Sequence, residues 1–189
     1  MSEYKPKLLL HICCVGCGVY VSQILKQDYE VILFFYNPNI WPEDEYIKRL
    51  IEAEKIAKQF KLKLVKGEYY HDKWLEAVHG YESDPERGTR CLICYKFRLE
   101  AAAAIAKKLS CKYLTTTLTT SPHKNALAIN EIGQQVAAQF GLEFLNQDFK
   151  KHDGFKKSSA LSRELGLYRQ NYCGCEYSYK STNQLRIYK

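Results

Sequence analysis

Five short apolar segments, each separated from the next by a helical pattern, span the first 150 residues of the chain. The segments KLLLHI, EVILFFYN, LKLVKG, KYLTTT and LEFLN have the length and the aliphatic or β-branched content of buried strands. Between them, apolar residues recur at helical spacing, most clearly at Ile47, Leu50, Ala53, Ala57 and Phe60. Strands that alternate with helices form parallel, right-handed βαβ units. The sequence therefore predicts an α/β fold, in which helices sandwich a Rossmann-like parallel sheet.

The remaining residues differ from this core in composition. We expect one domain over residues 1–189, with a core over 1–150 and a helical and loop-like appendage over 151–189. The appendage has eight Lys or Arg, three Asp or Glu and five Tyr, and the whole chain has a net charge of +7. Basic and aromatic residues together suit RNA, through phosphate pairing and base stacking, although a solvated basic tail has the same composition.

The chain has eight cysteines but no apolar run long enough for a transmembrane helix, and its N-terminus is a poor signal peptide. We therefore expect a cytoplasmic protein with no membrane partner. In a reducing compartment, these cysteines are not expected to form a structural disulfide framework. Cys111 stands alone before an apolar strand and is expected to be a buried, inert thiol.

Cysteines gather where the predicted strands and helices meet. Cys13 and Cys14 follow the first strand, and Cys17 falls in the first turn of the next helix. Cys91 and Cys94 begin a helix after the polar loop 79–90. Ligands of open parallel sheets bind beyond the carboxyl ends of the strands, and helix N-termini favour thiolate over thiol. We therefore expect both groups of sulfurs to meet at one rim of the sheet.

The spacing of these cysteines fits more than one chemistry. Two C-x-x-C pairs, one ending at Cys17 and one at Cys94, match a structural zinc site. Four thiolates also suit a [4Fe–4S] cluster, and a thiol–disulfide switch is a third possibility. Cys173 and Cys175 are separated by one residue, so a disulfide between them would be strained and easily reduced. This pair suits two-electron transfer, with further metal ligation as the alternative.

No nucleotide-binding fingerprint follows the first strand. The chain lacks G-x-G-x-x-G, G-K-[ST] and a Ser-Gly-Gly loop, and CCVGC occupies the corresponding position. We expect a fold of the HUP type, like that of the adenine nucleotide alpha hydrolases, whose phosphate site is occupied by sulfur. The missing loop argues against an ATP-dependent sulfur transferase. A redox metalloenzyme and a zinc-stabilised RNA-binding module without catalysis remain.

Four motifs together resemble the epoxyqueuosine reductase family QueH: LLLHICCVGC, RCLICYKFRLEAAA, TTLTTSPHKN and YRQNYCGCEYS. They occur in the family's order from Leu8 to Ser178. One departure is Gly16, where the family usually has proline. The resemblance implies reduction of epoxyqueuosine to queuosine in tRNA, the last step of queuosine biosynthesis, by a cobalamin-independent enzyme with a [4Fe–4S] cluster.

The resemblance also implies roles for individual residues. The cluster ligands would be Cys13, Cys14, Cys91 and Cys94, and the redox-active pair Cys173 and Cys175. An iron ion beside the cluster is implied, with Cys17 and the Cys173 and Cys175 pair as candidate ligands. The partners would be tRNA carrying epoxyqueuosine and an electron donor that the sequence does not identify. The motifs and the positive charge suggest these substrate-binding residues: Arg90, Tyr95, His123, Lys124, Arg169 and Tyr172.

Overall fold

A five-stranded parallel sheet forms the centre of the structure, a computed structural model that describes residues 4–180. Its strands are β1 (Lys7–Ile12), β2 (Glu30–Phe35), β3 (Lys63–Lys66), β4 (Tyr113–Thr116) and β5 (Glu143–Phe144). Their order is β3-β2-β1-β4-β5, and every pairing is parallel. The Rossmann-like prediction is confirmed. The order reverses between β1 and β4, which is where ligands bind in sheets of this kind.

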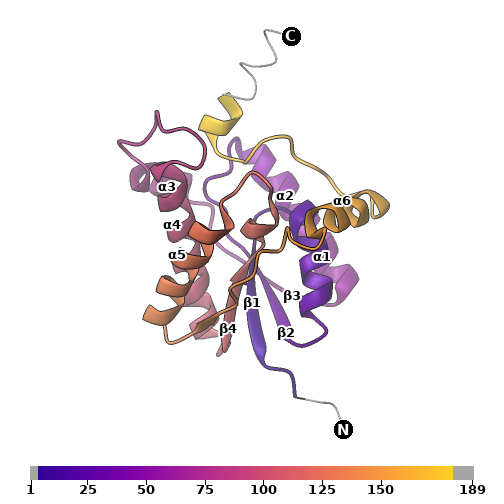
Figure 1. Ribbon diagram of the computed structural model, residues 1–189. Helices are drawn as coiled ribbons and strands as arrows, with labels where there is room; N and C mark the ends of the chain where they lie inside the picture. Colours follow the sequence, from indigo (N-terminus) through magenta and orange to yellow (C-terminus); the bar gives the residue numbers. More distant parts are fainter. Residues whose placement is uncertain (1–3, 181–189) are drawn as a thin grey trace.

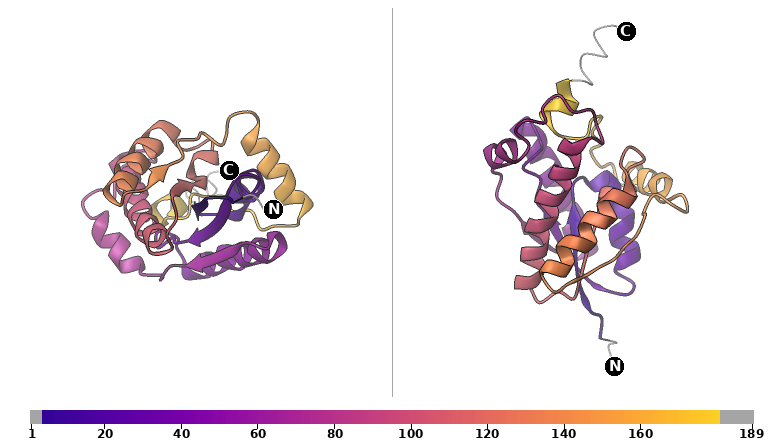
Figure 2. Two further views of the ribbon diagram at one scale, coloured as in Figure 1. Left: turned by 90° about the horizontal axis from the view of Figure 1, so that it is seen from below. Right: turned by 60° about the vertical axis from the view of Figure 1, so that its left-hand side comes forward.

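Helices cover both faces of the sheet (Figures 1 and 2). Alternate residues of a strand point to opposite faces, so Leu8 and Leu10 of β1 pack in one core and Leu9 packs in the other. The first core includes residues of α1 (Val15–Leu25) and α2 (Glu43–Phe60), and the second includes residues of α4 (Thr89–Lys108) and α5 (Ala126–Gln139). The helix α6 (Gly154–Glu164) packs against α1. Cys111 is buried in the second core, as expected.

Three elements differ from the sequence-based expectation. A short helix, α3 (His71–Ala77), was not predicted, since its seven residues are too few to show a helical period. Its Trp74 is 1% exposed, so tertiary burial anchors it. The next helix begins at Thr89, two residues before Cys91, and β5 contains only two of the five residues expected in the last strand. Of the predicted segment 151–189, residues 181–189 lie outside the described residues.

Ser121 and Pro122 have the sequence chemistry of a helix start, which predicts Ser121 as the cap of the next helix, but the structure corrects this prediction. A 3₁₀ helix, η1 (Thr117–Thr120), follows β4, and α5 begins only at Ala126. The Asn125 side chain accepts hydrogen bonds from the backbone N–H groups of Leu127 and Ala128, at 3.1 and 3.4 Å. Asn125 is therefore the N-cap, and it fixes the end of the loop that leads from η1.

Removing this cap is expected to lower stability. Asn125→Ala leaves two N–H groups of α5 without their side-chain acceptor, which costs about 1 kcal/mol of unfolding free energy. Urea unfolding followed by circular dichroism measures the change. Ser121→Ala is the matched control and is expected to cost less, because the Ser121 hydroxyl accepts one hydrogen bond, from the N–H of His123 at 3.3 Å, and not two. Equal losses in the two variants would contradict the assignment of the cap.

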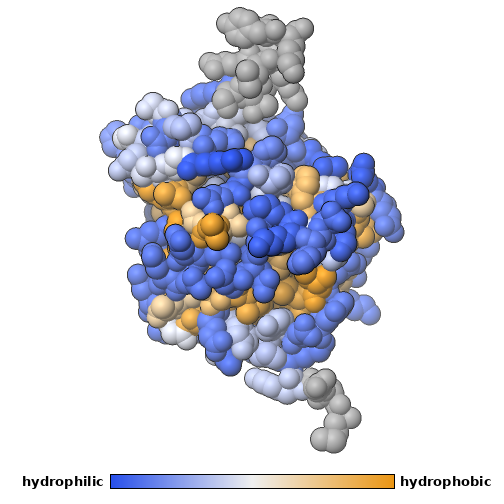
Figure 3. Space-filling model, in the orientation of Figure 1, coloured by the Kyte–Doolittle hydropathy of each residue, from blue (hydrophilic) through white to orange (hydrophobic). Residues whose placement is uncertain are grey.

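The surface is mainly polar on the face that carries α5 and α6. Figure 3 shows this face as largely hydrophilic, with smaller hydrophobic groups between the polar side chains. Within residues 4–180, no helix combines the length and the apolar character needed to cross a membrane.

Candidate functional site

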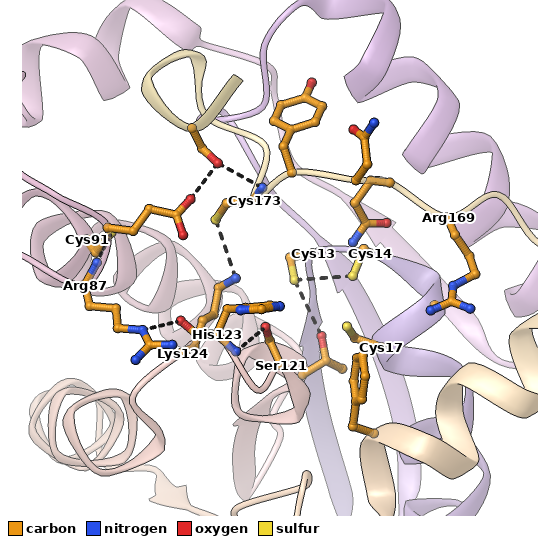
Figure 4. Close-up of a pocket in the computed structure, with 18 of the residues that line it drawn as sticks. Cys13, Cys14, Cys17, Arg87, Cys91, Ser121, His123, Lys124, Arg169 and Cys173 are labelled. Carbon is orange, nitrogen blue, oxygen red and sulfur yellow. Dashed lines mark hydrogen bonds between the residues drawn. The ribbon is translucent and has the colours of Figure 1, made fainter. Parts of the chain in front are cut away.

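A pocket of about 450 Å³ opens at the carboxyl end of the sheet, above β1 and η1 (Figure 4). Four separate parts of the chain line it: the turn from β1 into α1, the region where α4 begins, the loop between η1 and α5, and the C-terminal segment with α6. Its size is typical of small-ligand sites. The sheet order explains the meeting of these parts, because the pocket lies at the reversal between β1 and β4.

Five cysteines line this pocket: Cys13, Cys14, Cys17, Cys91 and Cys173. All eight cysteines of the chain are free thiols. The Sγ atoms of Cys13 and Cys14 lie 4.0 Å apart. Cys13 and Cys91 pack against one apolar cluster that includes Tyr95, although 78 positions of sequence separate them. Cysteines from both groups of the predicted ligand set, Cys13 and Cys14 in one and Cys91 in the other, thus line the same pocket.

Cys94 and Cys175 lie behind the pocket wall. Each is 8% exposed, and both pack in a cluster with Trp74 and Val78. The two sulfurs of the CGC turn therefore differ in surroundings, since Cys173 lines the pocket and Cys175 is covered. In the described part of the chain, no three His, Cys, Asp or Glu side chains stand close enough to share one metal ion. A four-iron cluster places each ligand on a separate iron, so its sulfurs are spread more widely than those around one ion.

Arg49 of α2 fixes the backbone of the CGC turn through hydrogen bonds. The Arg49 guanidinium, 2% exposed, donates to the carbonyl oxygens of Cys173 and Tyr172 at 3.1 and 3.4 Å. The carbonyl of Gly174 accepts from the N–H of Trp41 at 2.8 Å. Gly174 has φ of +131°, and a Cβ there would come within 3.0 Å of Arg49 Nη1. Only glycine fits this turn without strain, which explains the residue between the two cysteines.

The other side of the turn is tied to the loop before α4. The Ser178 hydroxyl accepts from the N–H of Cys173 at 3.1 Å and donates to the Glu86 carboxylate at 2.6 Å. Figure 4 shows this chain of contacts at the pocket wall. Glu86 itself lines the pocket. The position of the Cys173 sulfur thus depends on residues far apart in sequence.

Two cations, the partly exposed Lys124 and the buried Arg98, lie beside the sulfurs. Lys124 Nζ lies 3.5 Å from Cys173 Sγ (Figure 4), and Arg98 Nη1 lies 3.9 Å from Cys94 Sγ. Burial acts to lower the pKa of Lys124, but the charges of Cys173 and Cys13 outweigh it and raise that pKa. The pocket therefore favours negative charge on its sulfurs or on a group that they bind.

Four of these thiols have a raised pKa, which favours their protonated form. Burial raises the pKa of Cys91 and Cys94, so desolvation outweighs the helix N-terminus that we expected to favour thiolate. A hydrogen bond from Cys13 lowers the pKa of Cys14, but the bond to Cys17 and burial raise it overall to about 11. Burial also raises the pKa of Cys175 to about 12. Metal binding at these sulfurs must therefore release protons.

Of the predicted substrate-binding residues, five line the pocket: Tyr95, His123, Lys124, Arg169 and Tyr172. The Tyr172 hydroxyl donates to the carbonyl of Trp41 at 2.5 Å. The sixth, Arg90, does not line it. Its guanidinium is buried, lies 4.6 Å from the centre of the Tyr177 ring, and donates to the carbonyls of Tyr81 and Glu82. Arg90 holds the loop 81–84 in place.

Sequence reasoning missed Arg49, Glu86 and Ser178, which shape the site, and it suggested Arg98 only as a phosphate contact, whereas Arg98 is buried beside Cys94. Arg98 carried a usable signal, because it lies one helical turn after Cys94. Ser178 lies five residues after Cys173, and its contact arises from the fold of the C-terminal segment. Arg49 and Glu86 are far in sequence from the CGC motif that they help to hold, and no local sequence pattern indicates this role.

Two solved structures with a similar fold are of proteins whose names refer to tRNA modification. One is the U34-tRNA thiolase NcsA from Methanococcus maripaludis with its [4Fe–4S] cluster, with a TM-score of 0.61 and 13% identity. The match covers 93% of this chain and 62% of that one. A second is a predicted subunit of tRNA methyltransferase from Methanocaldococcus jannaschii, with a TM-score of 0.54, 12% identity, and coverage of 87% and 93%. At these identities the likeness establishes the fold alone.

Sequence comparison is more specific. The family model described as epoxyqueuosine reductase QueH matches residues 8–181. An epoxyqueuosine reductase QueH from Thermotoga maritima is 39% identical, over 90% of this chain and 89% of its own length. Relatives of the same name from Streptococcus pyogenes and Acinetobacter baylyi are 35% and 34% identical, over 95% and 99% of this chain and 72% and 87% of their own lengths. The chain therefore belongs to the epoxyqueuosine reductase QueH family.

Proposed function

We propose that this protein reduces epoxyqueuosine in tRNA to queuosine, the last step of queuosine biosynthesis. Relatives matched over nearly the whole chain are named epoxyqueuosine reductases. The observation that carries the proposal is the meeting of cysteines from three distant motifs at one pocket. A zinc-stabilised RNA-binding module would account for the paired cysteines, but it gives no role to Cys173 in the pocket wall.

The proposed cofactor is a [4Fe–4S] cluster held by Cys13, Cys14, Cys91 and Cys94. The donor set fits it, because the ligands are thiols and the nearby cations Arg98 and Lys124 suit an anionic group. When bound, such a cluster transfers electrons one at a time. An adjacent iron, with Cys17 among its ligands, is the second part of the proposal. The fold neighbour NcsA, which has a [4Fe–4S] cluster, supports the first part only.

The reaction converts an epoxide to an alkene, which takes two electrons and two protons and releases water. Cys173 lines the pocket and Cys175 is its partner in the same turn, so oxidation of this dithiol to a disulfide would supply two electrons. An external reductant then restores the dithiol. Tyr95 and His123 line the pocket and are the candidate proton donors. His11 is not a candidate proton donor, because it is fully buried, shares a hydrogen bond of 2.8 Å with Thr116, and does not line the pocket.

The proposed macromolecular partner is tRNA. The net charge of +7 suits a polyanion. Arg87, Lys124 and Arg169 line the pocket and would contact phosphate or the modified base. A cytoplasmic location is part of this proposal, because free cysteines persist in a reducing compartment.

Anaerobic purification tests the cofactor and the reaction together. The oxygen-free protein is expected to be brown, to contain about four or more irons per chain, and to give an EPR signal after reduction. With a reductant, it is expected to convert epoxyqueuosine in tRNA to queuosine, followed by mass spectrometry of digested tRNA. Removal of iron by a chelator is expected to abolish this activity. A colourless, inactive protein with one zinc per chain would instead establish the zinc-binding alternative.

A further inference from the structure

Arg98 is a buried guanidinium with no acidic partner among the described residues. It lies on α4 and is 2% exposed. Its Nη2 donates to Asn37 Oδ1 at 2.5 Å and its Nη1 to Cys94 Sγ at 3.9 Å, while its Nε has no partner in residues 4–180. Arg49, equally buried, differs in this respect, because Glu45 Oε1 lies 2.7 Å from its Nε. An unpaired buried charge is costly, so Arg98 requires another source of negative charge.

The surroundings of Arg98 locate that source. Asn37, which accepts from Arg98, donates through Nδ2 to the carbonyl of Ile12 at 2.9 Å. The guanidinium is thereby tied to the end of β1, directly before Cys13, and it contacts Cys94 on its own helix. The guanidinium thus lies beside one sulfur of the proposed ligand set and is fixed next to the strand end that precedes another.

We propose that Arg98 is a positioning residue that balances the negative charge of the cluster and raises its reduction potential. Four thiolates make a cluster anionic, and one more electron adds to that charge. A fixed cation nearby therefore stabilises the reduced cluster more than the oxidised one. Asn37 holds the cation in place, and the buried site weakens solvent screening. This inference rests on the proposed function, because it needs the cluster.

A redox titration of the loaded protein, followed by EPR, tests the proposal. Arg98→Met is expected to shift the one-electron reduction equilibrium at least about tenfold toward the oxidised cluster, which lowers the potential by about 59 mV. Arg98→Lys keeps the charge and is expected to lie closer to the wild type. Lys96→Met is the matched control, because it removes the same charge from the same helix. The Lys96 side chain is 61% exposed and screened by solvent, so the potential is expected to stay unchanged.

The protein without iron gives a second readout. Thermal unfolding of iron-free Arg98→Met is expected at a temperature no lower than that of the iron-free wild type, since the variant removes an unpaired buried charge. If loaded Arg98→Met has the potential of the wild type, the proposal is wrong. If that variant does not fold, Arg98→Lys and Asn37→Ala decide. Arg98→Lys moves the positive charge, Asn37→Ala removes the side chain that holds the guanidinium, and each is expected to lower the potential by a smaller amount. A wild type that binds no cluster would refute the proposed function instead.

Discussion

Replacing Cys91 with alanine is expected to abolish both the cluster and the reduction of epoxyqueuosine. Cys91 lines the pocket and packs against the same apolar cluster as Cys13, so its loss removes one of four proposed ligands. Mutation of a residue that only supports a metal ligand typically lowers metal affinity or activity by about 10-fold to 100-fold. Loss of the ligand itself is therefore expected to lower activity by more than about 100-fold. Iron analysis and the tRNA assay, both under oxygen-free conditions, measure the two effects.

Cys111→Ala is the matched control for this experiment. Cys111 precedes β4 at the opposite end of the sheet, and it is 6% exposed within an apolar core. Its removal costs only packing, so iron content and activity per folded protein are expected to match the wild type. Normal iron content in Cys91→Ala would remove Cys91 from the ligand set.

Replacing Cys173 with alanine is expected to separate the cofactor from turnover. The cluster is expected to remain, because Cys173 is outside the proposed set of four ligands. Turnover is expected to fall below detection, because Cys175 alone cannot form the intramolecular disulfide. Iron content and the EPR signal report the cluster, and queuosine formation reports turnover. The same result is expected for Cys175→Ala.

Two results would contradict this role for Cys173. Normal formation of queuosine by the variant would mean that the CGC pair carries no electrons. A loss of about one iron per chain, with the EPR signal of the cluster kept, would make Cys173 a ligand of the adjacent iron. Lys124 Nζ is 3.5 Å from the Cys173 sulfur, so Lys124→Met is a useful comparison, since it changes the charge beside the sulfur and keeps the thiol.

The sheet was predictable because its strands are fully buried. Residues such as Leu9, Leu33 and Phe35 are 0% exposed, and continuous apolar runs of this kind are typical of parallel strands. The meeting of Cys13 with Cys91 followed from the same prediction, since the carboxyl ends of parallel strands share one edge. The α3 helix was missed because tertiary burial of Trp74 anchors it, and the Asn125 cap was missed because it depends on two local hydrogen bonds within a polar stretch.

The charged residues of the site show what the sequence leaves open. Arg90 and Arg169 look alike as basic residues near cysteine motifs, but Arg90 turns inward to backbone carbonyls and Tyr177, whereas Arg169 lines the pocket. Arg98 and Arg49 are buried by contacts between distant segments, which no local pattern specifies. The roles assigned to the cysteines and to the substrate-binding residues remain predictions.

The C-terminal segment, which carries Cys173 and is tied down by Arg49 and Glu86, is the last part of the described chain to be synthesised. Chains fold from the N-terminus during translation, so Cys13 and Cys91 are in place before the segment that covers them. For that interval the nascent protein would present at an open rim the thiols that we propose as iron ligands. The order of translation would thus give iron delivery an earlier and wider route than the finished molecule offers.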